Sequence, residues 1–225
     1  MAAYLVGSIP WGVLIGLTAQ GVDIRHQGSG SMGATNVLRT LGLRLSLVVF
    51  LLDLLKGVVA VLFARWLASG ALISGYPLFE PLPNTATAEV AAGLAAAMGH
   101  NWPLYVRFRG GKGVATSLGA LLAISPLTGT VAFLVGILTI AVSRYASVGS
   151  MVGAAAGVAG LVALHFWIGY PWHYVAYGLM ALALILVRHG ANLQRLAKGT
   201  EPRVSLTPGQ VTLPSHEVRN LHRAP

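Results

Sequence analysis

Residues 114–142 read VATSLGALLAISPLTGTVAFLVGILTIAV, a run of 29 residues without a charged side chain. One straight helix of that length would extend about 43 Å, which exceeds the roughly 30 Å of hydrocarbon in a bilayer. Proline ends or kinks a helix, and Ser125-Pro126 stands inside the run. The run therefore predicts two short membrane-spanning pieces. The alternative is one merged span.

The whole chain shows the same apolar character. Its hydrophobic content is 55% and its charged content 9%, whereas a soluble domain carries about 25% charged residues. A soluble or disordered protein is therefore excluded. The absence of cysteine excludes a disulfide framework, cysteine-ligated zinc, iron–sulfur clusters and a thiol nucleophile. Further apolar stretches of helical length lie at residues 2–19, 45–67, 86–102, 147–168 and 172–187.

The positive charges predict the orientation. Of the 15 Lys and Arg residues, 12 lie at residues 25–44, 107–112 and 188–223. Cytoplasmic loops carry an excess of Lys and Arg, and only an odd number of spans places all three regions on that side. We therefore expect an all-α polytopic membrane protein, a seven-helix transmembrane bundle, with five helices as the alternative. Its N-terminus lies outside and its C-terminus in the cytoplasm.

The chain reads as one integral membrane domain over residues 1–203, followed by a polar, flexible cytoplasmic tail at 204–225. The net charge of +9 is explained by positive cytoplasmic loops beside anionic lipid, or by an anionic substrate. Because the sequence has neither a stacked aromatic platform nor a basic helix, we expect no nucleic-acid partner.

The first polar cluster, residues 28–36, reads GSGSMGATN and precedes Arg39. Glycine takes left-handed backbone conformations without steric cost, so the amides of this loop can converge on an anion as a nest. Hydroxyl and amide side chains add donors, and an arginine adds a bidentate fork for phosphate. The candidate residues are Gly28, Ser29, Gly30, Asn36 and Arg39. The alternative is an interhelical turn whose glycines serve close packing.

The second cluster, residues 99–116, reads GHNWPLYVRFRGGKGVAT. It departs from the P-loop nucleotide-binding pattern because glycine stands where a magnesium-binding Ser or Thr would be. A glycine-rich turn that leads into a helix still offers free N–H groups to an anion, and a lysine neutralises phosphate oxygens. The candidate residues are Gly110, Gly111, Lys112 and Gly113, whereas His100 alone reads as structural. The alternative is a positive loop that only fixes topology.

The third cluster begins with RHGAN at residues 188–192. His189 and Asn192 are three residues apart, so they share one face if the last helix continues. A histidine at the membrane surface can carry a proton or donate to a phosphate; the alternative is a solvated helix end. Asp53 and Lys56 are also three apart, within an apolar span. Ionisable groups at that depth are functional candidates, but a structural ion pair is equally supported, so both stay outside the predicted site.

In chain order, these clusters are recognisable. GSIPWG at 7–12, GVDIR at 21–25, GSGSMGATNVLR at 28–39, GHNWPLYVRFRGGKGVAT at 99–116 and RH-x-x-N-x-x-RL-x-x-GTE at 188–201 resemble the bacterial acyl-phosphate:glycerol-3-phosphate acyltransferases, the PlsY family. The resemblance extends over residues 4–203. It implies seven helices and transfer of an acyl group from acyl phosphate to the 1-hydroxyl of glycerol 3-phosphate. The products are lysophosphatidic acid and phosphate, in the first acylation step of phospholipid synthesis.

The resemblance also implies roles and a location. Ser29, Lys112, His189 and Asn192 correspond to catalytic positions. The substrate-binding positions are Gly28, Gly30, Asn36, Arg39, Gly110, Gly111, Gly113 and Glu201. Ser31 departs from the family pattern, which often has Asn there. The implied location is the bacterial cytoplasmic (inner) membrane, with the active site facing the cytoplasm. The implied partners are the two substrates, membrane lipid and an enzyme that supplies acyl phosphate; no cofactor and no metal are expected.

The chemistry of the residues agrees with this reading. An acyl phosphate is an activated mixed anhydride, so no protein nucleophile is required, and placed donors stabilise the developing oxyanion. The base stays open between His189 and a phosphate oxygen of the substrate. Ser29 as a covalent acyl carrier is disfavoured because no base is adjacent in sequence. The alternative function is a transporter or flippase of an anionic lipid or phosphate compound, although transporters usually bind near mid-membrane rather than on one side.

Overall fold

The computed structural model describes residues 1–69 and 85–204, and every regular element within these ranges is helical. The long and medium helices are α2 (Trp11–Gln20), α4 (Leu43–Ser69), α6 (Ala86–Asn101), α7 (Val114–Ile124), α8 (Pro126–Ser143), α9 (Ala146–Ile168) and α10 (Trp172–Arg188). The short elements are α1 (Ala2–Gly7), η1 (Ile24–His26), α3 (Ala34–Leu41), η2 (Leu104–Val106) and α11 (Gly190–Ala197). The predicted all-α class is therefore confirmed.

Four helical segments of the described chain are long and apolar enough to cross a membrane: Ala2–Gln20, Leu43–Ser69, Pro126–Ser143 and Ala146–Ile168. A fifth results if α10 and α11, which are bent by 59° to one another, count as one span. The protein is thus a multi-pass membrane protein. The 11 residues of α7 extend only about 16 Å, so neither seven nor five crossings follows from length, and the number remains a prediction.

The apolar run at residues 114–142 divides where its proline predicts. Ser125 has an extended backbone, with φ −143° and ψ 93°, and it ends α7 and caps α8, whose first residue is Pro126. Proline suits the first position of a helix because its missing N–H has no partner there anyway. Pro10 marks a second break, in the first apolar stretch: α1 ends at Gly7, and Pro10 is the N-cap of α2, which begins at Trp11. Both breaks follow from the proline positions alone.

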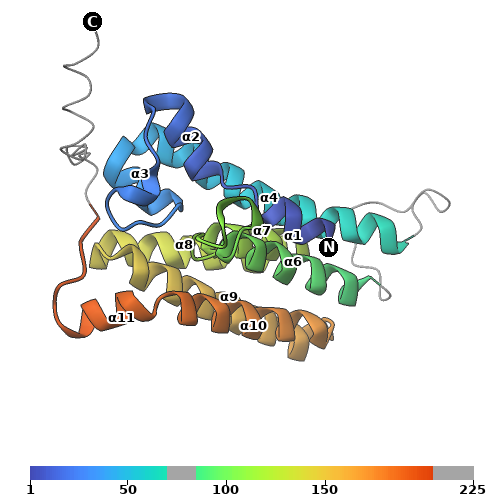
Figure 1. Ribbon diagram of the computed structural model, residues 1–225. Helices are drawn as coiled ribbons and strands as arrows, with labels where there is room; N and C mark the ends of the chain where they lie inside the picture. The colour runs from blue at the N-terminus through green and yellow to red at the C-terminus, as the bar shows by residue number, and fades with distance from the viewer. Residues whose placement is uncertain (70–84, 205–225) are drawn as a thin grey trace, which may run out of the picture.

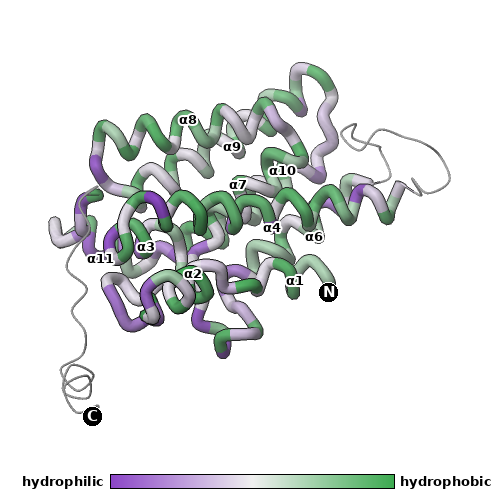
Figure 2. The backbone as a smooth tube through the Cα atoms, turned by 90° about the horizontal axis from the view of Figure 1, so that it is seen from above, coloured by the Kyte–Doolittle hydropathy of each residue, from purple (hydrophilic) through white to green (hydrophobic). Residues whose placement is uncertain are grey.

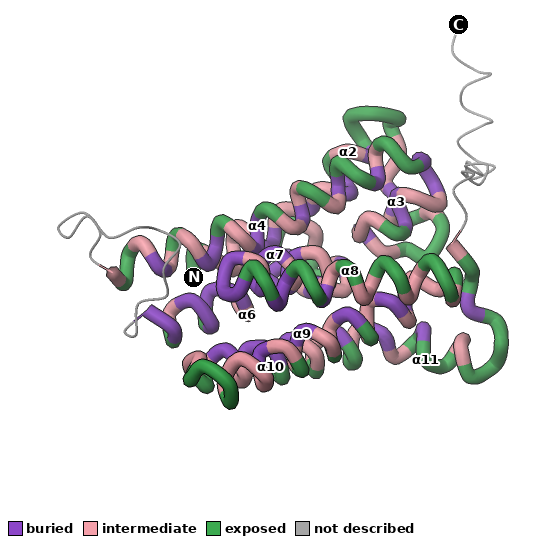
Figure 3. The backbone as a smooth tube through the Cα atoms, turned by 180° about the vertical axis from the view of Figure 1, so that it is seen from behind, coloured by how far each residue is buried: buried purple, intermediate pink, exposed green. Residues whose placement is uncertain are grey.

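α6 and α7 form the centre of the bundle, as their predominantly buried residues show in Figure 3. α4 packs along both of them, and α8, α9 and α10 lie on the other side of α7 in Figure 1. Glycines permit the close approach. A side chain at Gly57 of α4 would collide with the Thr116 carbonyl of α7, and one at Gly119 of α7 with the Leu54 carbonyl of α4. Small residues at such contacts are typical of packing between membrane helices.

A buried ion pair ties the bundle together away from the polar loops. Arg65 of α4 donates from Nε and Nη2 to the two carboxylate oxygens of Glu89 of α6, both at 2.9 Å. Tyr174 of α10 donates its hydroxyl to Glu89 at 3.1 Å, and Arg65 also donates to the Ala123 carbonyl of α7 at 2.8 Å. A bidentate pair with further hydrogen bonds is the arrangement that lets two charges be buried. It joins four helices.

The hydrophilic residues gather at the end of the bundle that holds α3 and α11, as Figure 2 shows. α3, the start of α9 and the segment after α11 meet there, because Arg39 donates to the Pro202 carbonyl and Ser147 donates to Glu201. The predicted tail at 204–225 lies outside the described residues except for Val204. The single-domain boundary at 203 therefore stays a prediction.

Candidate active site

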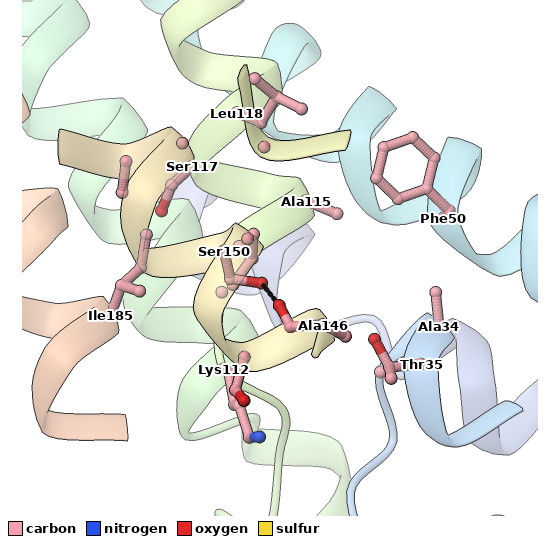
Figure 4. A pocket seen from close by; sticks show the side chains of 18 of the residues that line it. Ala34, Thr35, Phe50, Lys112, Ala115, Ser117, Leu118, Ala146, Ser150 and Ile185 are labelled. Atoms are coloured by element: carbon pink, nitrogen blue, oxygen red, sulfur yellow. Dashed lines mark hydrogen bonds between the residues drawn. The ribbon is translucent and has the colours of Figure 1, made fainter. Parts of the chain in front are cut away.

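A cavity of about 400 Å³ lies between the polar end and the centre of the bundle. Its polar lining comes from all three clusters: Ser29, Ser31, Thr35, Asn36, Arg39, Lys112, Asn192 and Glu201. Its apolar lining comes from the long helices: Phe50, Leu118, Leu121, Ala132, Phe133, Ile137, Ile140, Tyr177 and Ile185. In Figure 4, Thr35 and Lys112 lie in the lower part of the view, and Phe50 and Leu118 lie in the upper part. One cavity therefore offers both phosphate-binding groups and room for a hydrocarbon chain.

Asn36 organises the first loop. Its side-chain amide donates to the carbonyls of Ile24, Gln27 and Ser31 at 2.8–3.1 Å. Its Oδ1 accepts from the Ser29 amide at 2.8 Å and from the Ser29 hydroxyl at 3.2 Å. This exhausts the donors of an asparagine side chain. The buried Asn36 shapes the loop, and its hydrogen bonds are made within the protein.

The glycines of this loop take the conformations that the sequence predicts. Gly28 and Gly30 have φ of 55° and 71°, in the left-handed region. The Gly30 amide, however, donates to the Gln27 carbonyl at 3.0 Å, and the Gly33 amide to the Ser31 hydroxyl at 3.3 Å. Together with the Ser29 amide, these N–H groups have partners inside the loop. The amides left for an anion are those at the start of α3, whose first residues line the cavity.

Arg39 lies in α3 and lines the cavity. One of its terminal nitrogens donates to the Pro202 carbonyl at 3.3 Å, while its buried Nε has no partner among the described residues. Burial lowers the pKa of the guanidinium, an effect that Glu201 opposes. An arginine with an unused buried donor beside a cavity is suited to a phosphate oxygen.

The second-cluster glycines pack against the end of α6. A side chain at Gly110 would collide with the His100 and Asn101 carbonyls, and one at Gly111 would collide with the His100 ring at Nε2. The Gly111 amide donates to the His100 carbonyl at 3.0 Å, and the Gly111 carbonyl accepts two bonds from Arg188 at 2.8 and 3.0 Å. The peptide groups of Gly111 are thus engaged within the protein. Its glycine identity serves close packing.

Gly113 has φ of 74° and caps α7, whose first residues line the cavity. The first amides of a helix have no partner inside it, and they carry the positive end of the helix dipole. α3 begins at the same cavity, with Gly33 as its cap. Two helix N-termini therefore point at one cavity that also holds Arg39 and Lys112, which is an arrangement for binding two anionic groups.

Lys112 connects the second cluster to the third. Its Nζ donates to Asn192 Oδ1 at 2.6 Å, and the Asn192 amide donates to Glu201 Oε1, also at 2.6 Å. Burial lowers the pKa of Lys112 to about 8; Glu201 opposes this shift, while Arg195, Arg39 and Arg188 add to it. The Lys112 ammonium therefore loses its proton at a lower pH than an ordinary lysine does.

Glu201 holds this connection in place. Besides Asn192, the Ser147 hydroxyl and the Arg195 Nε donate to its carboxylate, both at 2.8 Å. Burial acts to raise its pKa, but the hydrogen bonds from Asn192, Ser147 and Arg195 outweigh it, so the pKa is lowered. Glu201 lines the cavity, yet three donors within the protein occupy its oxygens. It orients Asn192, which in turn orients Lys112.

His189 lies at the junction of α10 and α11. Its Nδ1 lies 2.8 Å from the Ile185 carbonyl, so Nδ1 carries the proton and Nε2 of the neutral ring is an acceptor. The side chain is buried, and His189 is not among the described residues that line the cavity. The geometry therefore brings Ser29, Asn36, Arg39, Lys112, Asn192 and Glu201 to one place and leaves His189 beside it.

Sequence reasoning missed three contributors. Ser147 lies in the first turn of α9, outside any motif, and is identified by its place in the cavity lining and its bond to Glu201. Asp53 and His100 also line the cavity, and they lie on the helices α4 and α6. The signal was present for Asp53, as a charge within an apolar span. No group of three His, Asp or Glu that would hold a metal ion occurs within residues 1–69 and 85–204.

Comparison with known proteins adds independent findings. Residues 1–199 match the profile of a family described as glycerol-3-phosphate acyltransferase. A glycerol-3-phosphate acyltransferase of Desulforamulus reducens is 41% identical over 207 residues, covering 91% of this chain and 92% of the relative. One from an Anaeromyxobacter species is 44% identical over 207 residues, covering 90% and 93%.

The fold has relatives among solved structures. The crystal structure of PlsY, an integral membrane glycerol 3-phosphate acyltransferase, in its glycerol 3-phosphate form has a TM-score of 0.75 and 35% sequence identity. That match covers 91% of this chain and 92% of the other. The lysophosphatidic acid form of PlsY has a TM-score of 0.73 at the same identity and coverage.

Proposed function

This chain belongs to the glycerol-3-phosphate acyltransferase family, and from that premise we propose that its acyl donor is an acyl phosphate and that the cavity is its active site. The activity is acylation of glycerol 3-phosphate to lysophosphatidic acid. The donor decides which chemistry the cavity must perform, because a thioester and an acyl phosphate differ in leaving group and charge.

One observation carries the proposal. Two helix N-termini, Arg39 and Lys112 face a single cavity that also has a large apolar lining from the long helices. Glycerol 3-phosphate brings one phosphate and an acyl phosphate brings a second, together with a hydrocarbon chain. Helix N-termini with a neighbouring cation are established phosphate sites. The apolar lining from α4, α7, α8, α9 and α10 suits the chain.

The reaction is a direct displacement. The 1-hydroxyl oxygen of glycerol 3-phosphate attacks the acyl carbon, the bond from that carbon to the phosphate oxygen breaks, and a carboxylic ester and inorganic phosphate form. Lys112 compensates the charge that accumulates on the departing phosphate, and Arg39 holds the phosphate of the acceptor. Asn192 and Glu201 keep the Lys112 ammonium in position. The hydroxyl proton ends on the released phosphate.

The proton reaches that phosphate directly. His189 does not belong to the cavity lining, and the Ser29 hydroxyl donates to Asn36 rather than to a histidine. A protein base or a serine nucleophile would need such a contact. A phosphate oxygen of the substrate lies beside the hydroxyl by virtue of binding, so we assign the role of base to it.

The proposed active site also implies how the protein is oriented in the membrane. Placing the polar end in the cytoplasm puts the three basic regions on the side where Lys and Arg predominate, with the N-terminus outside, in the inner membrane. The acyl phosphate then arrives from an enzyme that phosphorylates or transfers acyl groups on the cytoplasmic side.

The test is a donor comparison. Purified protein in lipid cubic phase or detergent is mixed with palmitoyl phosphate and glycerol 3-phosphate, with palmitoyl-CoA as the parallel donor, while phosphate or CoA release is followed. We expect phosphate release that requires both substrates. Turnover of glycerol 3-phosphate with palmitoyl-CoA and not with palmitoyl phosphate would reject the acyl phosphate assignment. Phosphate release without glycerol 3-phosphate would reject direct transfer.

A further inference from the structure

The last described segment of the chain, residues 201–204, connects two parts of the polar end. On one side, Arg39 of α3 donates to the Pro202 carbonyl at 3.3 Å. On the other side, the Val204 amide donates to the carbonyl of Arg144, at the corner between α8 and α9, at 2.7 Å. In Figure 1 the segment that follows α11 runs past the ends of α8 and α9 toward α3. The segment therefore bridges helices that all line the cavity.

The segment itself belongs to the lining. Glu201 and Val204, at its two ends, line the cavity together with Arg39 and Ser147. The Ser147 hydroxyl, in the first turn of α9, donates to Glu201 at 2.8 Å. The segment is thus part of the cavity wall at the polar end, next to the arginine that we assign to the acceptor phosphate.

The corner that receives the segment has a costly backbone conformation. Arg144 ends α8 with φ 63° and ψ 15°, in the left-handed region that residues other than glycine seldom adopt. In that conformation its carbonyl accepts the Val204 amide. The guanidinium of Arg203 lies over the ring of the next residue, Tyr145, 5.8 Å from its centroid, which is a cation–π contact. Backbone outliers cluster at functional sites, and this one coincides with the attachment of the segment.

Water is the competitor that a wall at this place must exclude. An acyl phosphate is an activated anhydride, so its hydrolysis follows the same course as acyl transfer. A water oxygen attacks the acyl carbon, the bond from that carbon to the phosphate oxygen breaks, and a carboxylic acid and inorganic phosphate form. Closing an active site suppresses such side reactions. A wall beside the bound acceptor therefore favours the acceptor hydroxyl over water.

We propose that the 201–204 segment determines the acceptor specificity of the reaction: held by the Arg144 carbonyl, it encloses glycerol 3-phosphate at Arg39 and keeps water from the acyl carbon. Arg144 is a positioning residue, because it acts through the segment. The inference rests on the proposed acyl phosphate donor and on the assignment of Arg39 to the acceptor phosphate. It gives a function to contacts that extend beyond the third sequence cluster, which ends at Glu201.

Val204→Pro removes the backbone donor that holds the segment to the corner, because proline has no N–H. Val204→Ala is the matched variant, since it also shortens the side chain but keeps the N–H. The readout is the palmitate formed per lysophosphatidic acid formed, after subtraction of a protein-free blank. In Val204→Pro we expect this ratio and the KM for glycerol 3-phosphate to rise about threefold to tenfold, the effect of one lost hydrogen bond. Val204→Ala should stay close to the wild-type ratio.

A second pair of variants tests the positioning role of Arg144. Arg144→Gly keeps the carbonyl and suits the left-handed backbone, so its product ratio should be that of wild type. Arg144→Val places a β-branched residue in a conformation that such residues do not tolerate, so the corner should shift and the ratio should rise as in Val204→Pro. A role in folding alone would lower the melting temperature of Arg144→Val without changing the product ratio.

The outcomes are distinguishable. Size-exclusion chromatography and thermal unfolding in detergent establish that each variant is folded. Wild-type ratios in folded Val204→Pro and Arg144→Val would overturn the proposal while leaving the acyl phosphate donor intact. Slower turnover at an unchanged ratio would make the segment a structural tie and would also overturn it. Failure of the wild-type protein to use palmitoyl phosphate would overturn the donor assignment, and this inference with it, before any variant is measured.

A measurement on the unaltered protein covers the case in which the variants do not fold. Hydrogen–deuterium exchange of the Arg203 and Val204 amides, followed by mass spectrometry, reports whether the segment closes on the acceptor. Glycerol 3-phosphate should slow this exchange, because the bound phosphate at Arg39 holds the segment in place. A non-hydrolysable acyl phosphonate alone should have a smaller effect. Exchange that is indifferent to glycerol 3-phosphate would overturn the proposal.

Discussion

Lys112 Nζ donates to Asn192 Oδ1 at 2.6 Å, so two polar clusters that are 80 residues apart in the chain meet in one hydrogen bond. Asn192 has its amide fixed by Glu201, so the carbonyl oxygen is the only part of it that Lys112 can meet. The ammonium thereby keeps two further donors for a ligand. This relationship makes the third cluster a support for the cation of the second.

Lys112→Met removes the ammonium and keeps most of the side-chain volume. We expect kcat/KM for palmitoyl phosphate to fall by about 100-fold or more, because a preorganised charge no longer stabilises the departing phosphate. The control is Arg109→Ala, an exposed cation of the same loop. It should be close to wild type. Equal losses in the two folded variants would mean that the loop acts only through its overall charge.

The pH dependence should report the same lysine. Lys112 must be protonated to act, and its pKa is lowered to about 8, so kcat/KM should fall as the pH rises through about 8. Lys112→Arg keeps its charge at that pH and should lose this alkaline fall, even if its absolute rate is lower. An unchanged fall in Lys112→Arg would assign the titration to another group.

Arg39→Ala should weaken the acceptor side of the reaction. Its buried Nε lacks a protein partner among the described residues, and its side chain lines the cavity. We expect KM for glycerol 3-phosphate to rise about tenfold or more, the effect of losing a charged hydrogen bond to phosphate, with a smaller change for the donor. Initial rates at varied concentrations of each substrate measure the split. If only the kinetics with palmitoyl phosphate were impaired, Arg39 would bind the phosphate of the acyl donor instead of that of glycerol 3-phosphate.

Local patterns predicted the helices because their causes are local. The breaks at Pro10 and Pro126 follow from proline chemistry, and the left-handed Gly28 and Gly30 follow from their spacing. The number of membrane crossings does not follow in this way. Helices as short as α7 become stable through packing against α4, and that packing involves Gly57 and Gly119 from distant parts of the chain.

The sequence predicted which residues belong to the candidate site, but it did not predict which of them contact one another. The clusters identified Lys112, Asn192 and Glu201, but only the tertiary structure shows that Glu201 accepts hydrogen bonds from Asn192 and Ser147. Ser147 has no sequence signal because its bond to Glu201 joins residues that are 54 positions apart in the chain. His100 likewise contacts Lys56, which lies 44 positions earlier in the chain, and no local pattern predicts that contact.

Glu201→Gln should weaken the hydrogen bonds through which Glu201 and Asn192 hold Lys112. A glutamine offers one acceptor and one donor group where three donors converge, so a bond to Arg195 or Asn192 is replaced by donor–donor repulsion. We expect a lower melting temperature and a loss in kcat/KM about tenfold or greater. Ser147→Ala removes one donor only and should lose about threefold. A fully active Glu201→Gln would contradict the support role.

The difference in melting temperature between wild type and Glu201→Gln should depend on pH. The pKa of Glu201 is lowered in the folded protein, so its stabilisation is present above the ordinary carboxyl pKa of about 4.3 and is lost as the pH falls below that value. Melting temperatures of wild type and Glu201→Gln should therefore converge in acid. A difference in melting temperature that stays constant as the pH falls from about 5 through the lowered pKa of Glu201 would show that packing, rather than the carboxylate charge, is responsible.

Gly111→Ala tests the contact between the glycine loop and α6. The new methyl group would collide with His100 Nε2 and lie 2.8 Å from Cδ2, so either the loop or the ring must move. A displacement near 1 Å at a reacting group costs about 100-fold, and we expect that loss with palmitoyl phosphate. Gly190→Ala is the matched control, because no heavy atom lies within 4 Å of its new methyl group. If both alanine variants kept wild-type kinetics, the loop would be free to shift and Lys112 would not depend on His100 for its position.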